Sequence, residues 1–238
     1  MSIYNLLCKP GKKFALLIDP GKYSVQSLIA TVYAADELKI NAILVGGSLV
    51  SDRIDSTIEI IKKNTNIPVV LFPGSLLQLS NKADAILLLS LISGRNPEYL
   101  IGNHVLAAPY LKKSAIEVIP TGYILIGEDN FSSVEYISNT KPIPSDKYDL
   151  AVATAIAGEL MGNKLIYLES GSGVNKSIDA ELVKEVKRSI SIPLIVGGGL
   201  KDPRQIVEIS KAGADIVVVG NAVENNLDIL EALVKALH

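Results

Sequence analysis

A glycine-rich segment ends each of the last three hydrophobic runs of the chain. They read "YLESGSG" at Tyr167–Gly173, "VGGGL" at Val196–Leu200 and "VGNAVE" at Val219–Glu224. Glycine lets backbone N–H groups approach an anion closely, and the start of a following helix adds positive potential. One such segment is a weak signal, because turns use glycine for its backbone freedom. Three in succession predict a phosphate-binding site.

A carboxylate lies inside the first of these segments. Glu169 ends a run of hydrophobic residues and precedes Ser170 and Gly171. A negative side chain beside a bound anion costs free energy, which indicates a task such as taking a proton from a hydroxyl of a phosphorylated substrate. The alternative is a structural one, in which Glu169 accepts hydrogen bonds from backbone amides of its loop. Both interpretations place Glu169 at the centre of the candidate site.

Two earlier segments offer oxygen ligands for a cation. Asp19 stands in "LLIDPGK" and Ser48 in "VGGSLV". A carboxylate near bound phosphates needs a cation, and Mg²⁺ is the hard cation that protein and phosphate oxygens share. Both residues also have ordinary local uses, since Asp-Pro-Gly is a common turn and serine a common N-cap. Arg95, in "SGRNP", is a candidate for a second phosphate or a solvated surface residue.

The elements that must position these residues are short aliphatic runs, which are typical of buried parallel strands. Helical periodicities lie between most of them, at Ser24–Lys39, Asp52–Thr65, Asp179–Ser189 and Pro203–Ala212. The alternation predicts an α/β fold, a (β/α)₈ TIM barrel in a single domain over residues 1–238, with its site at the carboxyl ends of the strands. The eight expected strands are Phe14–Ile18, Ala42–Val45, Pro68–Phe72, Ala85–Leu89, Glu117–Ile126, Lys164–Leu168, Pro193–Val196 and Asp215–Val219.

One connection of the expected barrel is too short for a full helix. Only Pro73–Asp84 separates the third strand from the fourth, so this helix is expected to be shortened or replaced by a loop. A barrel that lacks an outer helix has a groove in its side, and the residues of this segment include Leu76, Leu77 and Leu79. In contrast, Gly94–Lys113 and Gly127–Gly162 are long enough for helices with extra loops.

Composition narrows the class of protein. Hydrophobic residues make up 48% of the 238 residues and the formal net charge is −2, with no basic block of the kind that binds nucleic acid. Cys8 is the single cysteine, which favours a reducing, cytoplasmic location. No apolar run approaches the roughly 20 residues of a transmembrane helix, although transient contact with a membrane surface stays compatible with the sequence. His104 and His238 are not paired in a way that indicates a zinc site.

Taken in order, several motifs resemble the geranylgeranylglyceryl phosphate synthase family, in the branch found in some archaea and in Bacteroidetes-like bacteria. The motifs include "FALLIDPGK", "AILVGGSLV", "SLISGRNPEYLIGNHVLAAP", "EVIPTGYILIG", "LIYLESGSG", "PLIVGGGL" and "GADIVVVGNAVE". The resemblance implies a Mg²⁺-dependent prenyltransferase that joins the 3-hydroxyl of sn-glycerol 1-phosphate to an allylic prenyl diphosphate and releases diphosphate. It implies magnesium ligation by Asp19 and Ser48 and a base role for Glu169. The implied glycerol-phosphate site comprises Tyr167, Leu168, Glu169, Ser170, Gly171, Ser172, Gly173, Gly198, Gly199, Gly220 and Asn221.

One position departs from the family pattern. Many relatives carry a lysine two residues before the aspartate that Asp19 matches, and this chain has Leu17 there. The contact of that lysine with a phosphate or diphosphate is then either lost or supplied by Lys22 or Arg95. The resemblance also favours a geranylgeranyl donor and a homo-oligomer, with the regions around Tyr99 and Tyr110 as contact surfaces.

Two other functions fit part of the pattern. A phosphosugar isomerase or cyclase would use the same phosphate loops, but it would need a carboxylate at the end of the fifth strand, where none precedes Glu128. A catalytically silent barrel that binds phosphate or lipid is the third interpretation. Simple binding would require neither Asp19 nor Glu169, so their joint presence favours an enzyme.

Overall fold

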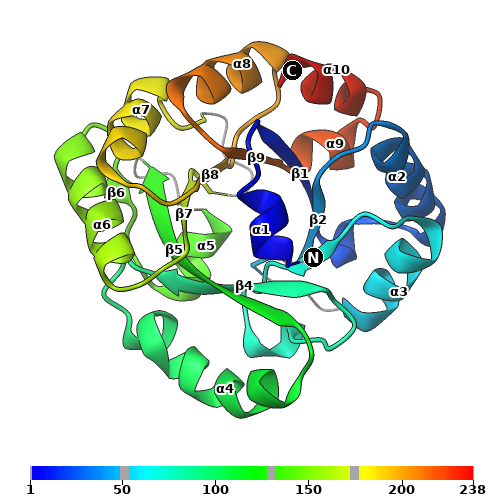
Figure 1. Cartoon of the computed structure of the whole chain (residues 1–238), viewed down its shortest axis with the longest axis horizontal. Coiled ribbons are helices and arrows are strands. Elements are labelled where there is room, and N and C mark those ends of the chain that lie inside the picture. Colours follow the sequence, from blue (N-terminus) through cyan, green and yellow to red (C-terminus); the bar gives the residue numbers. More distant parts are fainter. Residues whose placement is uncertain (1, 49–53, 128–131, 172–176, 238) are drawn as a thin grey trace.

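The computed structural model describes residues 2–48, 54–127, 132–171 and 177–237, and its strands form one closed parallel barrel (Figure 1). The barrel strands are β1 (Lys13–Ile18), β2 (Ala42–Val45), β3 (Val69–Leu71), β4 (Ala85–Leu91), β5 (Glu117–Gly127), β7 (Leu165–Glu169), β8 (Leu194–Gly197) and β9 (Ile216–Val219). They pair in the order β4-β3-β2-β1-β9-β8-β7-β5, and pairing of β4 with β5 closes the ring. A two-residue strand, β6 (Ile143–Pro144), adds to the end of β5. The predicted (β/α)₈ barrel is therefore confirmed.

Helices cover the outside of the barrel, as Figure 1 shows. They are α2 (Val25–Glu37), α3 (Ile54–Asn64), α4 (Asn103–Lys113), α6 (Tyr148–Leu160), α7 (Ala180–Ser189), α8 (Pro203–Ala212) and α10 (Ile229–Ala236). Their ends follow local sequence signals: Asp202 and Gln205 form a capping box at the start of α8, and Gly213, at φ +121°, ends it. Within the described ranges, no helix is both long and apolar enough to cross a lipid bilayer.

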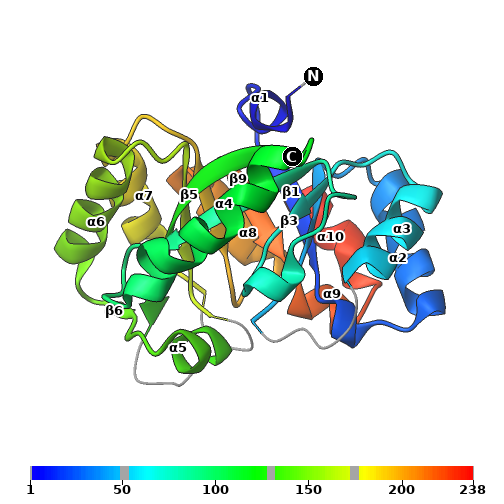
Figure 2. The same cartoon turned by 90° about the horizontal axis from the view of Figure 1, so that it is seen from below.

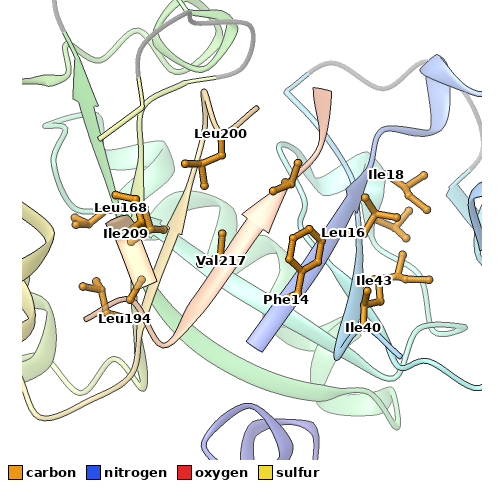
Figure 3. Close-up of a cluster of buried hydrophobic side chains, with 14 of the residues drawn as sticks. Phe14, Leu16, Ile18, Ile40, Ile43, Leu168, Leu194, Leu200, Ile209 and Val217 are labelled. Atoms are coloured by element: carbon orange, nitrogen blue, oxygen red, sulfur yellow. The ribbon is translucent and has the colours of Figure 1, made fainter. Parts of the chain in front are cut away.

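The hydrophobic core has two shells because successive residues of a strand point to opposite faces. Phe14, Leu16 and Ile18 on β1 pack outward against the helices, as do Leu168 and Val217 on their strands (Figure 3). The intervening residues fill the barrel interior, where aliphatic side chains pack with a few tyrosines. This close packing makes the barrel a rigid frame for the loops at its ends.

The two ends of the barrel differ. The short helix α1 (Ile3–Leu7) lies across the amino end, where the Glu117 carboxylate accepts hydrogen bonds from the Ile3 and Tyr4 amides and from the Ser2 hydroxyl (Figure 2). At the opposite end lie two other short helices, α5 (Ser133–Ser138) and α9 (Asn221–Asn225). The carboxyl ends of the strands are the end at which barrel enzymes carry their sites.

The barrel wall is incomplete between β3 and β4, as the short connection predicted. Only a three-residue 3₁₀ helix, η2 (Leu76–Gln78), follows β3. β3 pairs with Ala85 and Ile86 of β4, whereas β4 continues to Leu91. The next connection forms a single π-helical turn, η3 (Glu98–Gly102), that leads into α4. The carboxyl-terminal part of β4, beyond Ile86, therefore has no strand partner on the β3 side.

Candidate active site

The three glycine-rich segments meet at the carboxyl end of the barrel. Strand register places Glu169 beside Gly197, and Gly197 beside Val218, so the loops after β7, β8 and β9 are neighbours. Gly171, Gly198 and Gly199 have φ values of +103°, +83° and +64°, which L-amino acids with side chains rarely adopt. Backbone amides of neighbouring glycine loops are groups that can donate hydrogen bonds to an anion.

The other residues predicted for the phosphate site stay a prediction, and the structure places them as follows. Gly220 and Asn221 begin α9, next to the loop after β8. Tyr167 points into the barrel interior, whereas the Leu168 side chain packs in the outer shell and leaves only its backbone near the site. Ser172 and Gly173 lie outside the described residues.

Glu169 is almost entirely buried at the end of β7, with 5% of its surface exposed. Its Oε1 atom accepts a hydrogen bond of 2.8 Å from the Gly171 amide. Burial raises the pKa of Glu169 to about 7, against the opposing effects of the Gly171 amide and the Tyr167 hydroxyl. The carboxylate thus anchors its loop and also has the pKa that suits a general base near neutral pH.

Aromatic side chains surround this carboxylate inside the barrel. The ring centroid of Tyr167 lies 5.3 Å from that of Phe72 and 5.3 Å from that of Tyr123. The Phe72 and Tyr123 centroids are 6.0 Å apart. Burial and the charge of Glu169 raise the pKa of both tyrosines well above the ordinary value, so both stay neutral. The Tyr167 hydroxyl is buried beside the Glu169 carboxylate and stabilises its ionised form, which partly offsets the effect of burial on the pKa of Glu169.

Asp19 stands across the barrel end from Glu169, at the end of β1. It is half-buried, caps a short 3₁₀ turn (Pro20–Lys22) and accepts a hydrogen bond from the Gly21 amide. Partial burial raises the pKa of Asp19, while the Gly21 amide and the Lys22 charge lower it. Burial and the charge of Asp19 also raise the pKa of Glu224. Two partly buried carboxylates therefore lie close together, with Lys22 as the lysine that lowers both of their pKa values, and this arrangement favours a cation.

An apolar cavity enters the barrel where the wall is incomplete. Its volume is about 110 Å³, which is below the roughly 300–1,000 Å³ typical of small-molecule sites. Gly47 and Ser48 line the cavity, and Tyr123 connects it to the surroundings of Glu169. Its apolar wall consists of Phe72, Leu76, Leu79, Ile86, Leu88, Leu89, Leu91, Tyr99, Ala107, Tyr123, Val134 and Ile137. An extended hydrocarbon would find matching surroundings here.

Several residues weighed in the sequence lie elsewhere. Leu77 is 89% exposed and does not line the cavity, unlike Leu76, because the two point in different directions from η2. Arg95 donates to its own loop carbonyls, Ile92 and Gly94, and lines a separate polar pocket. Lys22, in contrast, lowers the pKa values of Asp19 and Glu224 and so lies close to both.

The Leu17 side chain packs beside Gly220, where a Cβ atom would come within 3.3 Å of the Leu17 Cβ. Leu17 therefore borders the loop after β9. Of Lys22 and Arg95, the two residues considered for a phosphate contact, Lys22 is the one with access to the barrel end.

Sequence patterns did not single out Tyr123, Glu224 or Gln78. Tyr123 could have been noticed because it stands opposite Tyr167 in the sheet and aromatic residues form only 5% of this chain. Glu224 lies in the last glycine-rich segment, but nothing local distinguishes it from a solvated helix residue. Gln78 carries no motif, and only its three-dimensional contacts reveal it.

A closed barrel with glycine loops, a buried carboxylate and an adjoining apolar cavity at one end defines a phosphate-binding barrel enzyme that accepts an apolar substrate. Comparison with known proteins refines this class. The model of the PcrB family matches residues 10–237, and the chain belongs to that family.

Proteins similar to this chain occur in bacteria and in archaea. A geranylgeranylglyceryl phosphate synthase of Chitinophaga pinensis is 48% identical over 228 residues, covering 95% of this chain and 90% of that protein. One of Methanosphaera stadtmanae is 39% identical over 232 residues, covering 96% and 95%. The crystal structure of (S)-3-O-geranylgeranylglyceryl phosphate synthase from Thermoplasma acidophilum, in complex with sn-glycerol-1-phosphate, superposes with a TM-score of 0.94 at 34% identity, covering 100% of this chain and 98% of that one.

Proposed function

We propose that this protein transfers a prenyl group, geranylgeranyl in preference to longer chains, from its diphosphate to the 3-hydroxyl of sn-glycerol 1-phosphate. The observation that carries the proposal is the meeting of two unlike sites at one barrel end. A phosphate-binding surface holding a buried carboxylate adjoins an apolar cavity, and Tyr123 lies between them. Such a pair suits a small phosphorylated acceptor and a long hydrocarbon donor. The names of the relatives agree with this assignment.

The acceptor is proposed to bind on the glycine loops, where its phosphate accepts hydrogen bonds from backbone amides around Gly198, Gly199 and Gly220. Its 3-hydroxyl then lies beside Glu169. As the hydroxyl oxygen bonds to the allylic carbon of the donor, the bond from that carbon to the diphosphate breaks, and the diphosphate leaves with the electron pair. The hydroxyl proton passes to the Glu169 carboxylate, whose raised pKa makes it a competent acceptor.

The donor is proposed to place its chain in the cavity and its diphosphate near Asp19 and Ser48. The residues here fit Mg²⁺, because Asp19 is a half-buried carboxylate and Ser48 offers a hydroxyl at the cavity rim. The described residues contain no cluster of three or more histidine, cysteine or acidic ligands, so phosphate oxygens and water would complete the coordination. When bound, the cation would stabilise the negative charge that develops on the departing diphosphate.

The whole chain, residues 1–238, is proposed to act as one prenyltransferase domain in the cytoplasm, as a homo-oligomer. Val105, Leu106 and Tyr110 on α4 are exposed and supply an apolar contact surface. Tyr99, the other residue considered for such contacts, is partly buried and donates to the Ile137 carbonyl, so it belongs to the cavity wall instead. Transient contact of the same apolar region with a membrane surface is compatible with a lipid product.

The reaction itself is tested by incubating the protein with Mg²⁺, either enantiomer of glycerol phosphate and prenyl diphosphates of several lengths, with products identified by mass spectrometry. We expect an ether product with sn-glycerol 1-phosphate, strongest with geranylgeranyl diphosphate, and its loss when EDTA removes the metal. Product from the opposite enantiomer at the same rate, or none from any donor, would reject the proposal.

Chain-length preference is expected to respond to the cavity wall at Leu76. Leu76→Trp fills space in the apolar cavity, so kcat/KM for geranylgeranyl diphosphate should fall about tenfold or more relative to that for a shorter farnesyl donor, a discrimination of the size that a few methylene groups supply. Leu77→Trp is the matched control, because the neighbouring side chain is exposed and outside the cavity. If Leu76→Trp and Leu77→Trp showed the same ratio of kcat/KM for the two donors, η2 would not be part of the donor site.

A further inference from the structure

A buried glutamine connects the loops after β2 and β3. Gln78, the last residue of η2, is 2% exposed. Its Oε1 atom accepts hydrogen bonds from the Gly47 amide at 3.1 Å and the Gly74 amide at 3.2 Å, and its Nε2 atom donates to the Gly47 carbonyl at 2.7 Å. The one side chain thus satisfies both backbone groups of Gly47 and fixes the orientation of the two peptides that flank this residue.

The two loops that Gln78 connects are packed backbone against backbone. A Cβ atom at Gly46 would lie 2.0 Å from the Phe72 carbonyl oxygen, and one at Gly74 would lie 2.3 Å from the Gly47 carbonyl oxygen. No side chain can separate them, so a shift of one loop displaces the other. The position of Gly47 is therefore set by Gln78 and by the loop that carries Gly74.

Gly47 in turn bears on the proposed cation site. A Cβ atom at Gly47 would lie 3.0 Å from Oδ2 of Asp19, which means that the Asp19 carboxylate packs directly on this glycine. Ser48, the other proposed ligand, is the next residue along the chain. Movement of the Gly47 peptide would consequently change both the support of Asp19 and the direction in which Ser48 presents its oxygen.

We propose that Gln78 is a positioning residue for the donor half of the site, holding Asp19 and Ser48 in the geometry that binds magnesium diphosphate. The inference rests on the proposed function, because it assigns the donor's diphosphate to these two residues. The inference also accounts for the short η2 element that stands after β3 in place of a covering helix. A full helix after β3 would occupy the space of the apolar cavity, and the short η2 element leaves that space open while its glutamine holds the loops together.

The test measures binding rather than turnover, with magnesium diphosphate and sn-glycerol 1-phosphate as separate probes in isothermal titration calorimetry. Gln78→Met keeps the size of the side chain and removes all three hydrogen bonds. We expect the Kd for magnesium diphosphate to rise about tenfold or more, since buried backbone groups lose their partners, with the Kd for sn-glycerol 1-phosphate within about twofold of wild type. Gln78→Glu keeps the two accepted amide hydrogen bonds and should bind magnesium diphosphate better than Gln78→Met.

Asn41→Leu is the matched control, because the Asn41 side chain also accepts a hydrogen bond from a backbone amide, that of Phe14, but at the amino end of the barrel. It should lower the melting temperature without changing either Kd. Equal weakening of both ligands by Gln78→Met, no weakening, or the same loss in Asn41→Leu would each overturn the positioning role. If Gln78→Met does not fold, wild-type affinity of Gln78→Asn for magnesium diphosphate overturns it as well. Failure of the wild type itself to bind magnesium diphosphate would instead reject the proposed function.

Discussion

Glu169→Gln should lower kcat by about 10²–10⁴-fold, the range that a positioned general base contributes, while sn-glycerol 1-phosphate binds with nearly wild-type affinity. The glutamine amide has the same shape and keeps an oxygen that can accept the Gly171 hydrogen bond seen for Glu169. The phosphate loops are therefore preserved, and the ability to take a proton is lost. Single-turnover kinetics and calorimetric binding separate the two quantities. Loss of binding in parallel with loss of turnover would contradict a base role.

The pH dependence provides an independent check on the same residue. Burial raises the pKa of Glu169 to about 7, and a general base acts only when ionised. For the wild type, kcat/KM for the acceptor should rise with pH up to about 7 and level off above it. In Glu169→Gln this rise should disappear from the residual activity. A wild-type profile that is already flat from pH 5 would show that no buried carboxylate controls the reaction.

The same substitution should make the protein more stable above pH 7. A carboxyl group whose pKa rises from 4.5 in the unfolded chain to about 7 in the folded one binds more protons when folded, so stability falls as pH increases between those values. The loss approaches about 3 kcal/mol at pH 8, at 1.36 kcal/mol per pKa unit, and the neutral glutamine avoids it. The difference in melting temperature between variant and wild type should therefore grow from pH 5 to pH 8. If the difference in melting temperature stayed constant from pH 5 to pH 8, ionisation of Glu169 would not be the cause of the pH-dependent loss of stability.

The strands and the glycine loops that follow them could be predicted from the sequence because their signals are local. An aliphatic run followed by a glycine segment requires no knowledge of distant residues, and Asp19, Ser48 and Glu169 each follow such a run. The shortened connection at Pro73–Asp84 was equally local, since its length alone excludes a covering helix. Chain order in a barrel then brings these positions to one end.

Properties that depend on distant neighbours could not be predicted in this way. The raised pKa of Glu169 comes from its nearly complete burial, which the closing of the barrel produces and no adjacent residue signals. Gln78 acquires its role only because the loops after β2 and β3 touch. Leu76 and Leu77 are chemically identical, and only the direction of each side chain from η2 distinguishes a cavity residue from an exposed one.

Gly198→Ala should weaken glycerol-phosphate binding strongly, because two independent constraints demand glycine at this position. Its φ of +83° is strained for an L-residue, which alone costs about 1–2 kcal/mol. In addition, a Cβ atom would lie 2.1 Å from Oε1 of Glu169, 2.4 Å from Oγ of Ser170 and 2.8 Å from the Ser170 backbone nitrogen. Relief of these contacts must move the β7 loop and its carboxylate away from β8. Calorimetry should show an increase in the Kd for sn-glycerol 1-phosphate of at least about 100-fold, the cost of losing two or more charge-assisted hydrogen bonds.

Gly162→Ala separates the two constraints, because Gly162 has a similar φ of +91° with no atom within 4 Å of the added Cβ. It lies in the turn after α6, which leads to the start of β7 and therefore to the amino end of the barrel. This control should lose stability from backbone strain alone and keep wild-type affinity and turnover. Gly198→Ala should lose more stability than the control and nearly all turnover, since displacement of the β7 loop removes the phosphate contacts and the base together. Wild-type affinity for sn-glycerol 1-phosphate in Gly198→Ala would mean that the acceptor phosphate binds away from the β8 loop. The acceptor would then have to bind near Asp19 and Ser48, and the donor diphosphate on the glycine loops.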